Sequence, residues 1–465
     1  MTDPSRPSRL VPLIIGAALF MQTLDATVVA NALPTMAAAL HESPLQLNLT
    51  ISVYLLSTAV FLPASSWLAD RFGARTVFLA AIAGFALASM LCGVARTLPQ
   101  LIAARALQGI AGAMMLPVGR LVLLKTVPKS QLVAAMAVLT MPALLGPIVG
   151  PVLGGAIVTY GSWRWIFFIN LPMGLLGLAL VGKYVPDIRE ASVPPFDTPG
   201  FLLTAIGLGC LVFALENVGR GTLSGGWIAL LAVAGTVALV RYAAHARRVP
   251  HPAVDLTLFR IPTFTAALVG GAFARLVLGA SPFLLALLLQ IGFGLSAFEA
   301  GLMTFASAAG ALLMKTAAPP ILRVFGFRPV LLANTLITAL VLMSYALFTS
   351  ATPAAIVVLV LFTGGFFPSL QFTSLQALAF ADVPRERMSR ATSLSSMGQQ
   401  LAQALGVALA AVTLHAALRA SGSDQVTSHA VGVTFVVVGI VSLLSLVFFL
   451  RLPREAAAEL SGRQR

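Results

Sequence analysis

Long apolar runs separated by short polar gaps make up almost the whole chain. Breaking the sequence at its charged, Pro and Gly clusters leaves fourteen runs of the length, about 20 residues, that a transmembrane helix needs. The predicted spans are 10–39, 46–69, 77–95, 98–124, 131–159, 163–183, 199–217, 227–244, 262–291, 298–318, 329–348, 354–380, 391–418 and 430–450. This pattern predicts an all-α membrane protein with 14 transmembrane helices.

Composition places the chain in a bilayer. Hydrophobic residues make up 58% of the sequence and charged residues 9%, and the mean hydropathy is +0.96, whereas a soluble domain carries about 25% charged residues. The net charge of +14 suggests nucleic acid as a partner, but the Lys and Arg residues fall in short gaps between apolar runs and are not interleaved with aromatic residues. We therefore expect the lipid bilayer, and no nucleic acid, as the partner.

The basic residues predict the orientation, because short cytoplasmic loops are enriched in Lys and Arg. With the N-terminus inside, 21 of the 29 basic residues are cytoplasmic; four are outside (Arg96, Arg164, Arg220 and Arg419) and four lie within spans (Arg105, Arg120, Arg275 and Lys315). Asp25 interrupts the first span and no small-residue cleavage site follows it, so we expect a retained helix rather than a signal peptide. The prediction is a multi-pass protein of the cell (inner) membrane with both termini cytoplasmic.

Two loops show weak internal symmetry. The loop after the second span reads Asp70-Arg-Phe-Gly-Ala-Arg75, and the loop after the tenth reads Arg323-Val-Phe-Gly-Phe-Arg328, so that Phe, Gly and the last Arg recur at equal spacing. Repeated halves around a central site are typical of secondary transporters. We expect a six-helix bundle over 1–185, an inserted helix pair with its linkers over 186–254, and a second six-helix bundle over 255–465.

The sequence does not indicate an enzyme. No loop is long enough for a catalytic domain, and no Gly-rich loop ending in Lys-Ser or Lys-Thr offers a phosphate site. The spans lack paired carboxylates, His clusters and nucleophile–base pairs. Cys92 and Cys210 lie in apolar spans, where we interpret them as small buried hydrophobes. We expect no metal and no cofactor.

The loop from Asp70 to Arg75 is a candidate latch between helices. Asp70, Arg71 and Arg75 place an acid and two guanidinium groups at a helix junction, and Gly73 permits a tight turn. The alternative is ordinary charge of a cytoplasmic loop.

Two charged residues are predicted at similar depth in the bilayer. Arg105 lies about 10 Å from the outer surface and Asp25 about 22 Å from the inner surface of a ~30 Å core, at 1.5 Å per helical residue. The two side chains are therefore able to pair. Because charge in a membrane costs several kcal/mol, such residues are candidates for function, and a purely structural ion pair is the alternative.

The fifth span carries a stripe of small residues. Gly146, Gly150 and Gly154 share one face of the helix, and Pro151 and Gly155 lie beside them. Small residues four apart let helices approach closely, and prolines introduce kinks. The stripe predicts a tight, bendable helix contact.

Together these motifs resemble those of the major facilitator superfamily, specifically its fourteen-span drug:proton antiporter family of the EmrB/QacA type. Two further segments, 24–34 and 163–172, look like signatures of the same family, and the resemblance covers nearly the whole chain. It implies a major facilitator fold of two pseudo-symmetric bundles that rock around a central cavity and export small molecules in exchange for protons. In two places the chain departs from the family: Ser66 replaces a usual Gly in the latch motif, and Arg323 replaces the acid in the second copy.

The resemblance also implies roles for the motif residues. Asp25 becomes the proton or substrate site and Arg105 its electrostatic partner. The segment from Asp70 to Arg75 becomes the cytoplasmic gate latch, and the segment from Gly146 to Gly155 becomes the antiporter helix motif.

The substrate class is left open by the sequence. Candidate substrate contacts are Gln22, Asp25, Arg275, Phe283, Gln371, Ser396 and Gln399. Arg275, near the membrane midplane, either receives an anionic group or pairs with Asp25 or a carbonyl. The leading hypothesis is a monomeric, proton-coupled exporter of small amphiphilic compounds or drugs. The alternatives are an exporter of small organic anions such as citrate or other carboxylates, and a non-transporting membrane sensor.

Overall fold

The computed structural model of the chain describes residues 10–126, 132–189, 193, 195–218, 223–384, 387–422 and 425–453. These residues form helices and connecting loops, with no strand among them. Thirteen helical segments in this part of the chain are long and apolar enough to cross a membrane, and Leu145–Tyr160 forms a shorter apolar helix within α6. The prediction of an all-α membrane protein is confirmed, with the fourteen-span count approximate.

The helices fall into three groups along the chain. The first group is α1 (Leu10–Leu40), α2 (Pro44–Leu47), α3 (Leu49–Phe72), α4 (Ala74–Val94), α5 (Leu98–Thr126), α6 (Leu132–Tyr160), α7 (Trp165–Phe168) and α8 (Asn170–Tyr184). The inserted pair is α9 (Thr198–Asn217) and α10 (Gly225–Ala246). The last group is η2 (Leu256–Arg260), α11 (Pro262–Thr265), η3 (Ala266–Gly270), α12 (Gly271–Ala286), η4 (Leu287–Gly292), α13 (Ala297–Phe325), α14 (Phe327–Ser344), η5 (Tyr345–Leu347), α15 (Ala354–Phe380), α16 (Met388–Ala420), α17 (Ser428–Ser442) and α18 (Ser445–Leu450).

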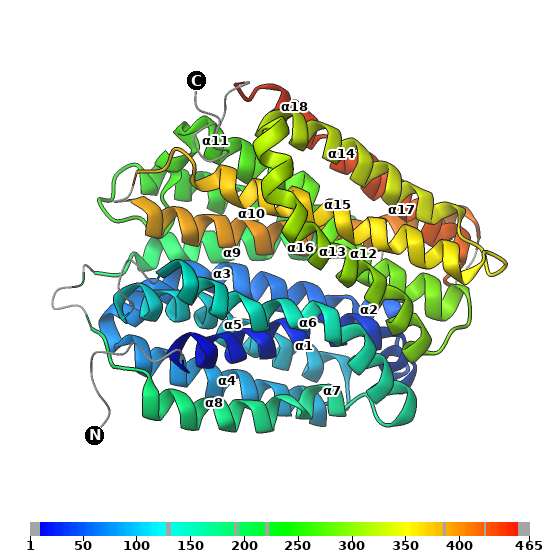
Figure 1. Cartoon of the computed structure of the whole chain (residues 1–465), viewed down its shortest axis with the longest axis horizontal. Coiled ribbons are helices and arrows are strands. Elements are labelled where there is room, and N and C mark those ends of the chain that lie inside the picture. The colour runs from blue at the N-terminus through cyan, green and yellow to red at the C-terminus, as the bar shows by residue number, and fades with distance from the viewer. Residues whose placement is uncertain are drawn as a thin grey trace.

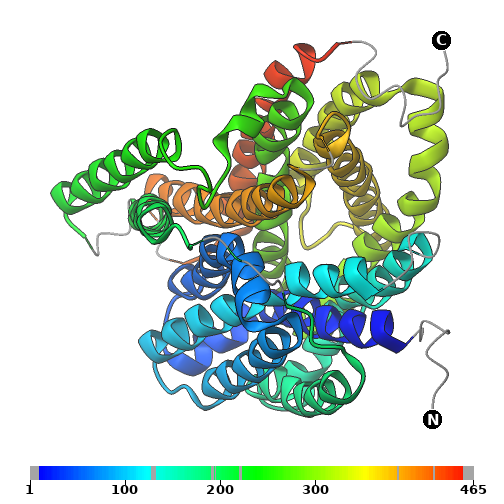
Figure 2. The same ribbon diagram turned by 90° about the vertical axis from the view of Figure 1, so that its left-hand side faces the viewer.

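The two larger groups lie side by side with their helices roughly parallel, and the start of α1 and the end of α18 lie toward the same side (Figure 1). We call this side the terminal end of the bundle and the opposite side the far end. The inserted pair lies outside the two bundles (Figure 2), where α9 packs against α3 and α16. An edge-to-face contact between Phe61 and Phe201, with ring centroids 5.3 Å apart, belongs to the α3–α9 interface.

The loop repeat found in the sequence marks the same turn in both halves. Gly73 joins α3 to α4 at φ 95°, and Gly326 joins α13 to α14 at φ 80°. These angles favour glycine over any residue with a Cβ. The recurring Arg makes a corresponding hydrogen bond in each half, to a backbone carbonyl of the last helix. Arg75 donates to the carbonyl of Gly182 in α8, and Arg328 donates to the carbonyl of Leu450 in α18.

Three predicted spans differ from the structure in their continuity. The span predicted at 163–183 is split into α7 and α8. The span predicted at 262–291 contains two π-helical segments, η3 and η4, which flank α12. The span predicted at 430–450 breaks between α17 and α18. A run of apolar residues predicts the length of a span but does not predict such local breaks. The π-helical segments are notable because they often occur at functional positions.

Several hydrogen bonds join the two halves at the far end. Asn31 of α1 donates to the carbonyl of Ala297 (3.1 Å) and accepts from Gln290 (3.1 Å). Thr159 at the end of α6 accepts from the N–H of Phe298 (3.1 Å). In the part of the chain that the structure describes, the halves are therefore closed onto each other at the far end.

Candidate ion-coupling and substrate site

Asp25 lies at the middle of α1 and is 1% exposed. Arg105 of α5, also 1% exposed, donates from Nη1 to Oδ2 of Asp25 at 2.6 Å. The guanidinium further donates to the carbonyl of Thr50 (3.3 Å) and lies over the ring of Tyr54, 4.3 Å from its centroid. The two residues that depth alone suggested as partners thus form a buried ion pair.

Two amides complete the shell of Asp25. Gln108 of α5 donates to Oδ1 at 2.9 Å, and Asn170 at the start of α8 donates to the same oxygen at 3.0 Å. Both amides also donate to Ser89 of α4. Each identified partner of the Asp25 side chain is therefore a donor, which suits an ionised carboxylate because it only accepts hydrogen bonds.

Sequence reasoning did not assign roles to Gln108, Asn170 and Ser89. Gln108 stands three residues after Arg105, so helical spacing places both on one face. Asn170 is in the segment 163–172 that resembles a family signature. Ser89 gives no signal in the sequence, because a single serine in an apolar span has many structural uses.

The glycine stripe of α6 packs directly onto the helix that carries Asp25. A Cβ on Gly146, Gly150 or Gly154 would come within 3.0 Å of Thr23, Thr27 or Val28 of α1. This confirms the predicted tight helix contact and places it beside Asp25.

The next face of α6 packs against the other half at the far end. A Cβ on Gly155 would clash with the carbonyl of Ala297, and a Cβ on Gly301 of α13 would clash with the carbonyl of Pro151. The helix α6 therefore touches α1 on one side and α13 on the other. It connects the contact with the second half to the helix that carries Asp25.

The candidate latch lies at the terminal end. The N–H of Ala74 donates to the carbonyl of Ile188 (3.0 Å), and a Cβ on Gly73 would meet Asp187 and Arg189 of the following linker. Arg71 is exposed. The segment therefore ties α3 and α4 to the linker after α8 within the first half.

Asp70 lines a cavity of about 200 Å³ at the same end. Trp67 and Asp70 of α3 form one wall, Arg390 of α16 forms another, and the linkers around the inserted pair contribute Asp197 and Asp255. Side chains of both halves and of the inserted pair's linkers therefore meet at this cavity.

Asp197 fixes the inserted pair at this end. It accepts hydrogen bonds from the N–H groups of Gly200 (3.0 Å) and Ala253 (3.0 Å) and lies 2.7 Å from Nε2 of His245. Burial acts to raise the pKa of Asp197, but the hydrogen bonds from His245, Ala253 and Gly200 outweigh it and hold the pKa below its ordinary value. The start of α9, the end of α10 and the following linker are thereby joined through one carboxylate.

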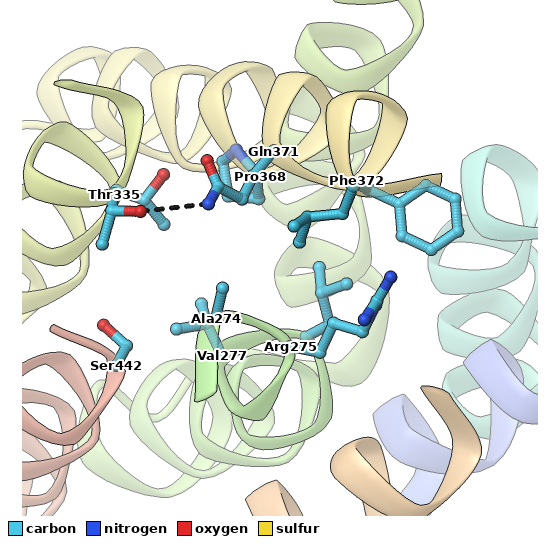
Figure 3. Close-up of a pocket in the computed structure, with 11 residues that line it drawn as sticks. Ala274, Arg275, Val277, Thr335, Pro368, Gln371, Phe372 and Ser442 are labelled. Atoms are coloured by element: carbon cyan, nitrogen blue, oxygen red, sulfur yellow. Dashed lines mark hydrogen bonds between the residues drawn. The ribbon is translucent and has the colours of Figure 1, made fainter. Parts of the chain in front are cut away.

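The second half carries a counterpart of the Asp25 shell that has no carboxylate among its described lining residues. In the first half, Asp25 and its hydrogen-bonded shell come from the first, third, fourth and sixth spans, which are α1, α4, α5 and α8. The corresponding spans of the second half are α12, α14, α15 and α17, and they surround a cavity (Figure 3). Its polar lining comprises Arg275, Thr335, Thr338, Gln371 and Ser442. Gln371 donates to Thr335 (3.0 Å), so a neutral network replaces the ion pair.

Arg275 lies at one end of this cavity, beside Phe372 (Figure 3). Its Nη1 donates to the carbonyl of Ala267 in the π-helical segment η3 (3.0 Å), and its side chain is 2% exposed. The buried Nε has no acceptor among the described atoms, and the side chain pairs with no carboxylate in the described ranges. The sequence left an anionic group, Asp25 or a carbonyl as alternative partners of Arg275. The structure shows the bond to a carbonyl and, among the described residues, no pairing with Asp25.

A second cation lies beside the same aromatic ring. Nζ of Lys315 of α13 is 5.4 Å from the centroid of Phe372 and donates to Thr373 (3.3 Å). Among the described residues Lys315 makes no ion pair with a carboxylate. The helices α12, α13 and α15 thus bring two cations to one aromatic side chain.

The other candidate substrate contacts differ in exposure. Gln22, Ser396 and Gln399 are half-buried, and Gln399 accepts from Gln376 (3.1 Å). Phe283 is 1% exposed within the apolar core. Gln371 is 4% exposed and engaged in the network of the second half. In this conformation Gln22, Ser396 and Gln399 are partly accessible, and Phe283 is not.

Comparison with known proteins agrees with these motifs. The model of the Major Facilitator Superfamily matches residues 15–279 and 267–465. The putative multidrug resistance protein MdtD of Salmonella typhimurium is 39% identical over 98% of this chain and 97% of its own length. The protein of the same name from Klebsiella pneumoniae is 40% identical over 100% of this chain and 99% of its own length.

Solved structures of low sequence identity share the fold. A D-xylose–proton symporter has a TM-score of 0.69 at 15% identity, over 96% of this chain and 98% of its own. The human organic anion transporter MFSD10 has a TM-score of 0.60 at 16% identity, over 96% of this chain and 100% of its own. The chain belongs to the major facilitator superfamily, and its resemblance to the drug:proton antiporter family of that superfamily is confirmed.

Proposed function

We propose that this protein exports small amphiphilic organic compounds or drugs in exchange for protons, by alternating access through a monomer. The observation that supports this most is the buried pair of Asp25 and Arg105 within a shell of donors. The names of the full-length relatives, which are called multidrug resistance proteins, support the same substrate class.

The donor shell suggests how a proton is coupled to movement. A protonated carboxyl carries an O–H that needs an acceptor, whereas Arg105, Gln108 and Asn170 all direct N–H groups at Asp25. Proton binding therefore requires at least one of these partners to withdraw or to turn an amide oxygen toward the carboxyl. Because the partners lie on α5 and α8, their withdrawal shifts these helices relative to α1.

We assign the terminal end to the cytoplasm and the protein to the cell (inner) membrane. The excess of Lys and Arg in the segments at that end supports this orientation. With this assignment the closed far end faces outward.

Transport into inverted membrane vesicles tests the proposal. An imposed proton gradient, acidic inside, should drive uptake of cationic amphiphilic dyes, and a protonophore should abolish it. Uptake that ignores the gradient would contradict proton coupling. Counterflow of labelled substrate, without any gradient, separates a transporter from a sensor that binds ligand without moving it.

We expect substitutions in the latch to slow the conformational cycle without weakening ligand binding. At φ 95° a side chain on Gly73 costs about 1–3 kcal/mol. Added to the barrier between the two states, this cost makes Gly73→Ala about 5- to 150-fold slower in transport. Asp70→Asn should act in the same direction. Ligand affinity by tryptophan fluorescence and transport in vesicles are the two measurements, and a large loss of affinity with a normal transport rate would show that the latch role is wrong.

A larger residue at the far-end contact should favour the outward-open state. A side chain at Gly301 clashes with the carbonyl of Pro151, and backbone cannot yield as a flexible side chain can. We expect Gly301→Val to increase the labelling of a cysteine placed at Ala297, which is 7% exposed, by a membrane-impermeant reagent. Gly225→Ala at the start of α10, where an added Cβ has open space, is the control for substitution near the same end. Unchanged labelling would mean that the contact does not hold the far end closed.

Export of small organic anions is the second candidate function. Arg275 and Lys315 lie beside Phe372 without a carboxylate partner among the described residues, and a carboxylate substrate is the natural ligand of such a pair. Binding assays that compare cationic dyes with di- and tricarboxylates distinguish this candidate from the first.

A further inference from the structure

The first turn of α3 connects three parts of the molecule. It includes the N-cap residue Asn48 and continues through Thr50 to Ser52, a rise of about 6 Å along the helix. All three side chains are at most 1% exposed. Each of the three residues makes a hydrogen bond to a different element outside α3.

The first of these bonds reaches the ion pair. The carbonyl of Thr50 accepts from Nε of Arg105, whose Nη1 holds Asp25. The direction in which the guanidinium faces Asp25 therefore depends on where the backbone of this turn lies.

The second bond crosses to the other half. Nδ2 of Asn48 donates to the carbonyl of Val407 in α16 at 3.5 Å, while its buried Oδ1 has no hydrogen-bond partner. Separation of the halves at the far end removes α16, and with it this bond.

The third bond reaches the inserted helix pair. Oγ of Ser52 donates to Oε1 of Glu216, which lies one residue before the end of α9 and is 1% exposed. A carboxyl group at such a position carries a desolvation cost that an apolar residue would avoid. The sequence showed Glu216 near an outer helix end without giving it a role.

We propose that Glu216 is a positioning residue for the Asp25–Arg105 pair. Through Ser52 it holds the first turn of α3, and the Thr50 carbonyl of that turn holds Arg105. The inserted helix pair then acts as a brace that keeps the guanidinium directed at Asp25, and Asn48 makes the same turn sensitive to opening of the far end. This proposal rests on the proton-coupled function of Asp25.

The test measures proton-driven uptake of a cationic dye in inverted vesicles as a function of pH. Ser52→Ala and Glu216→Leu both remove the bond, and we expect each to move the pH of half-maximal uptake by about 0.5–1 unit, a three- to tenfold change in proton affinity. Glu216→Gln keeps an acceptor for Ser52 and should remain close to the wild type. The dye affinity measured without a gradient should not change in any variant.

Two comparisons make the result specific. Because Ser52 and Glu216 act through one bond, the double variant Ser52→Ala/Glu216→Leu should shift the profile no further than either single variant. Thr236→Val removes an exposed hydrogen bond within α10 and should leave the profile unchanged. If Glu216→Leu fails to fold, the pH profile of Ser52→Ala alone tests the positioning role.

An unchanged pH profile in Ser52→Ala, or fully additive shifts in the double variant, would overturn the positioning role. Failure of the underlying function gives a different result. If Asp25→Asn retains wild-type proton coupling in the same vesicles, the proton site itself is wrong, whatever the Ser52 and Glu216 variants show.

Discussion

Asp25→Asn is expected to reduce proton-driven uptake to the level of vesicles that lack the protein. The amide keeps the volume of the side chain and removes the group that binds the proton. Ligand binding in the absence of a gradient should persist, because the substitution leaves the overall arrangement of helices in place. Uptake in inverted vesicles and binding to purified protein are the measurements.

The fold should survive this substitution at reduced stability. Without the carboxylate, Arg105 still donates to the carbonyl of Thr50 and to Oε1 of Gln108 (2.6 Å), and it still lies over Tyr54. Removing one partner of a buried ion pair costs about 3–5 kcal/mol, because the remaining charge loses its counter-charge. Thermal unfolding in detergent should therefore move to lower temperature while the elution profile stays monodisperse.

Glu42→Gln serves as the control, because Glu42 is a half-buried acid in the turn directly after α1. It should leave uptake unchanged. Wild-type coupling in Asp25→Asn would show that the buried ion pair is structural and that protons bind elsewhere.

Much of the architecture was predictable because the bilayer imposes strong constraints on sequence. Each span must be apolar over its whole length, so span positions follow from composition alone. The depth argument also succeeded for Asp25 and Arg105, since a buried charge in a span has few partners to choose from. The turn at Gly73 and its repeat at Gly326 were visible because positive φ restricts the residue type.

The partners of these residues were harder to predict. Gln108, Asn170 and Ser89 come from three different helices, and no sequence pattern specifies which faces of separate helices meet. The same limitation applies to the first turn of α3, where short polar residues look like ordinary helix-start residues. Only the packing shows that Ser52 faces Glu216.

Candidate substrate contacts were the least secure part of the prediction. Phe283 and Gln371 were chosen by residue type and span position, and the structure places the first in the apolar core and the second in a hydrogen-bond network. Whether a polar or aromatic residue faces neighbouring helices or a ligand depends on helix rotation. Apolar spans without amphipathic periodicity do not reveal that rotation.

Arg275→Gln is expected to weaken binding of a carboxylate substrate by about 1.5–3 kcal/mol, a 10- to 150-fold loss of affinity, if the protein exports organic anions. The guanidinium is buried, uses Nη1 on the carbonyl of Ala267, and keeps Nε without an acceptor beside Phe372. An anionic group at this position would supply the missing acceptor and the missing counter-charge.

Arg275→Lys keeps the charge and loses the planar fork, so it should give an intermediate affinity for carboxylates. Cationic dyes should bind both variants as they bind the wild type. Unchanged carboxylate affinity, together with a lower unfolding temperature, would make Arg275 a structural partner of η3 and would favour amphiphilic compounds as the substrate.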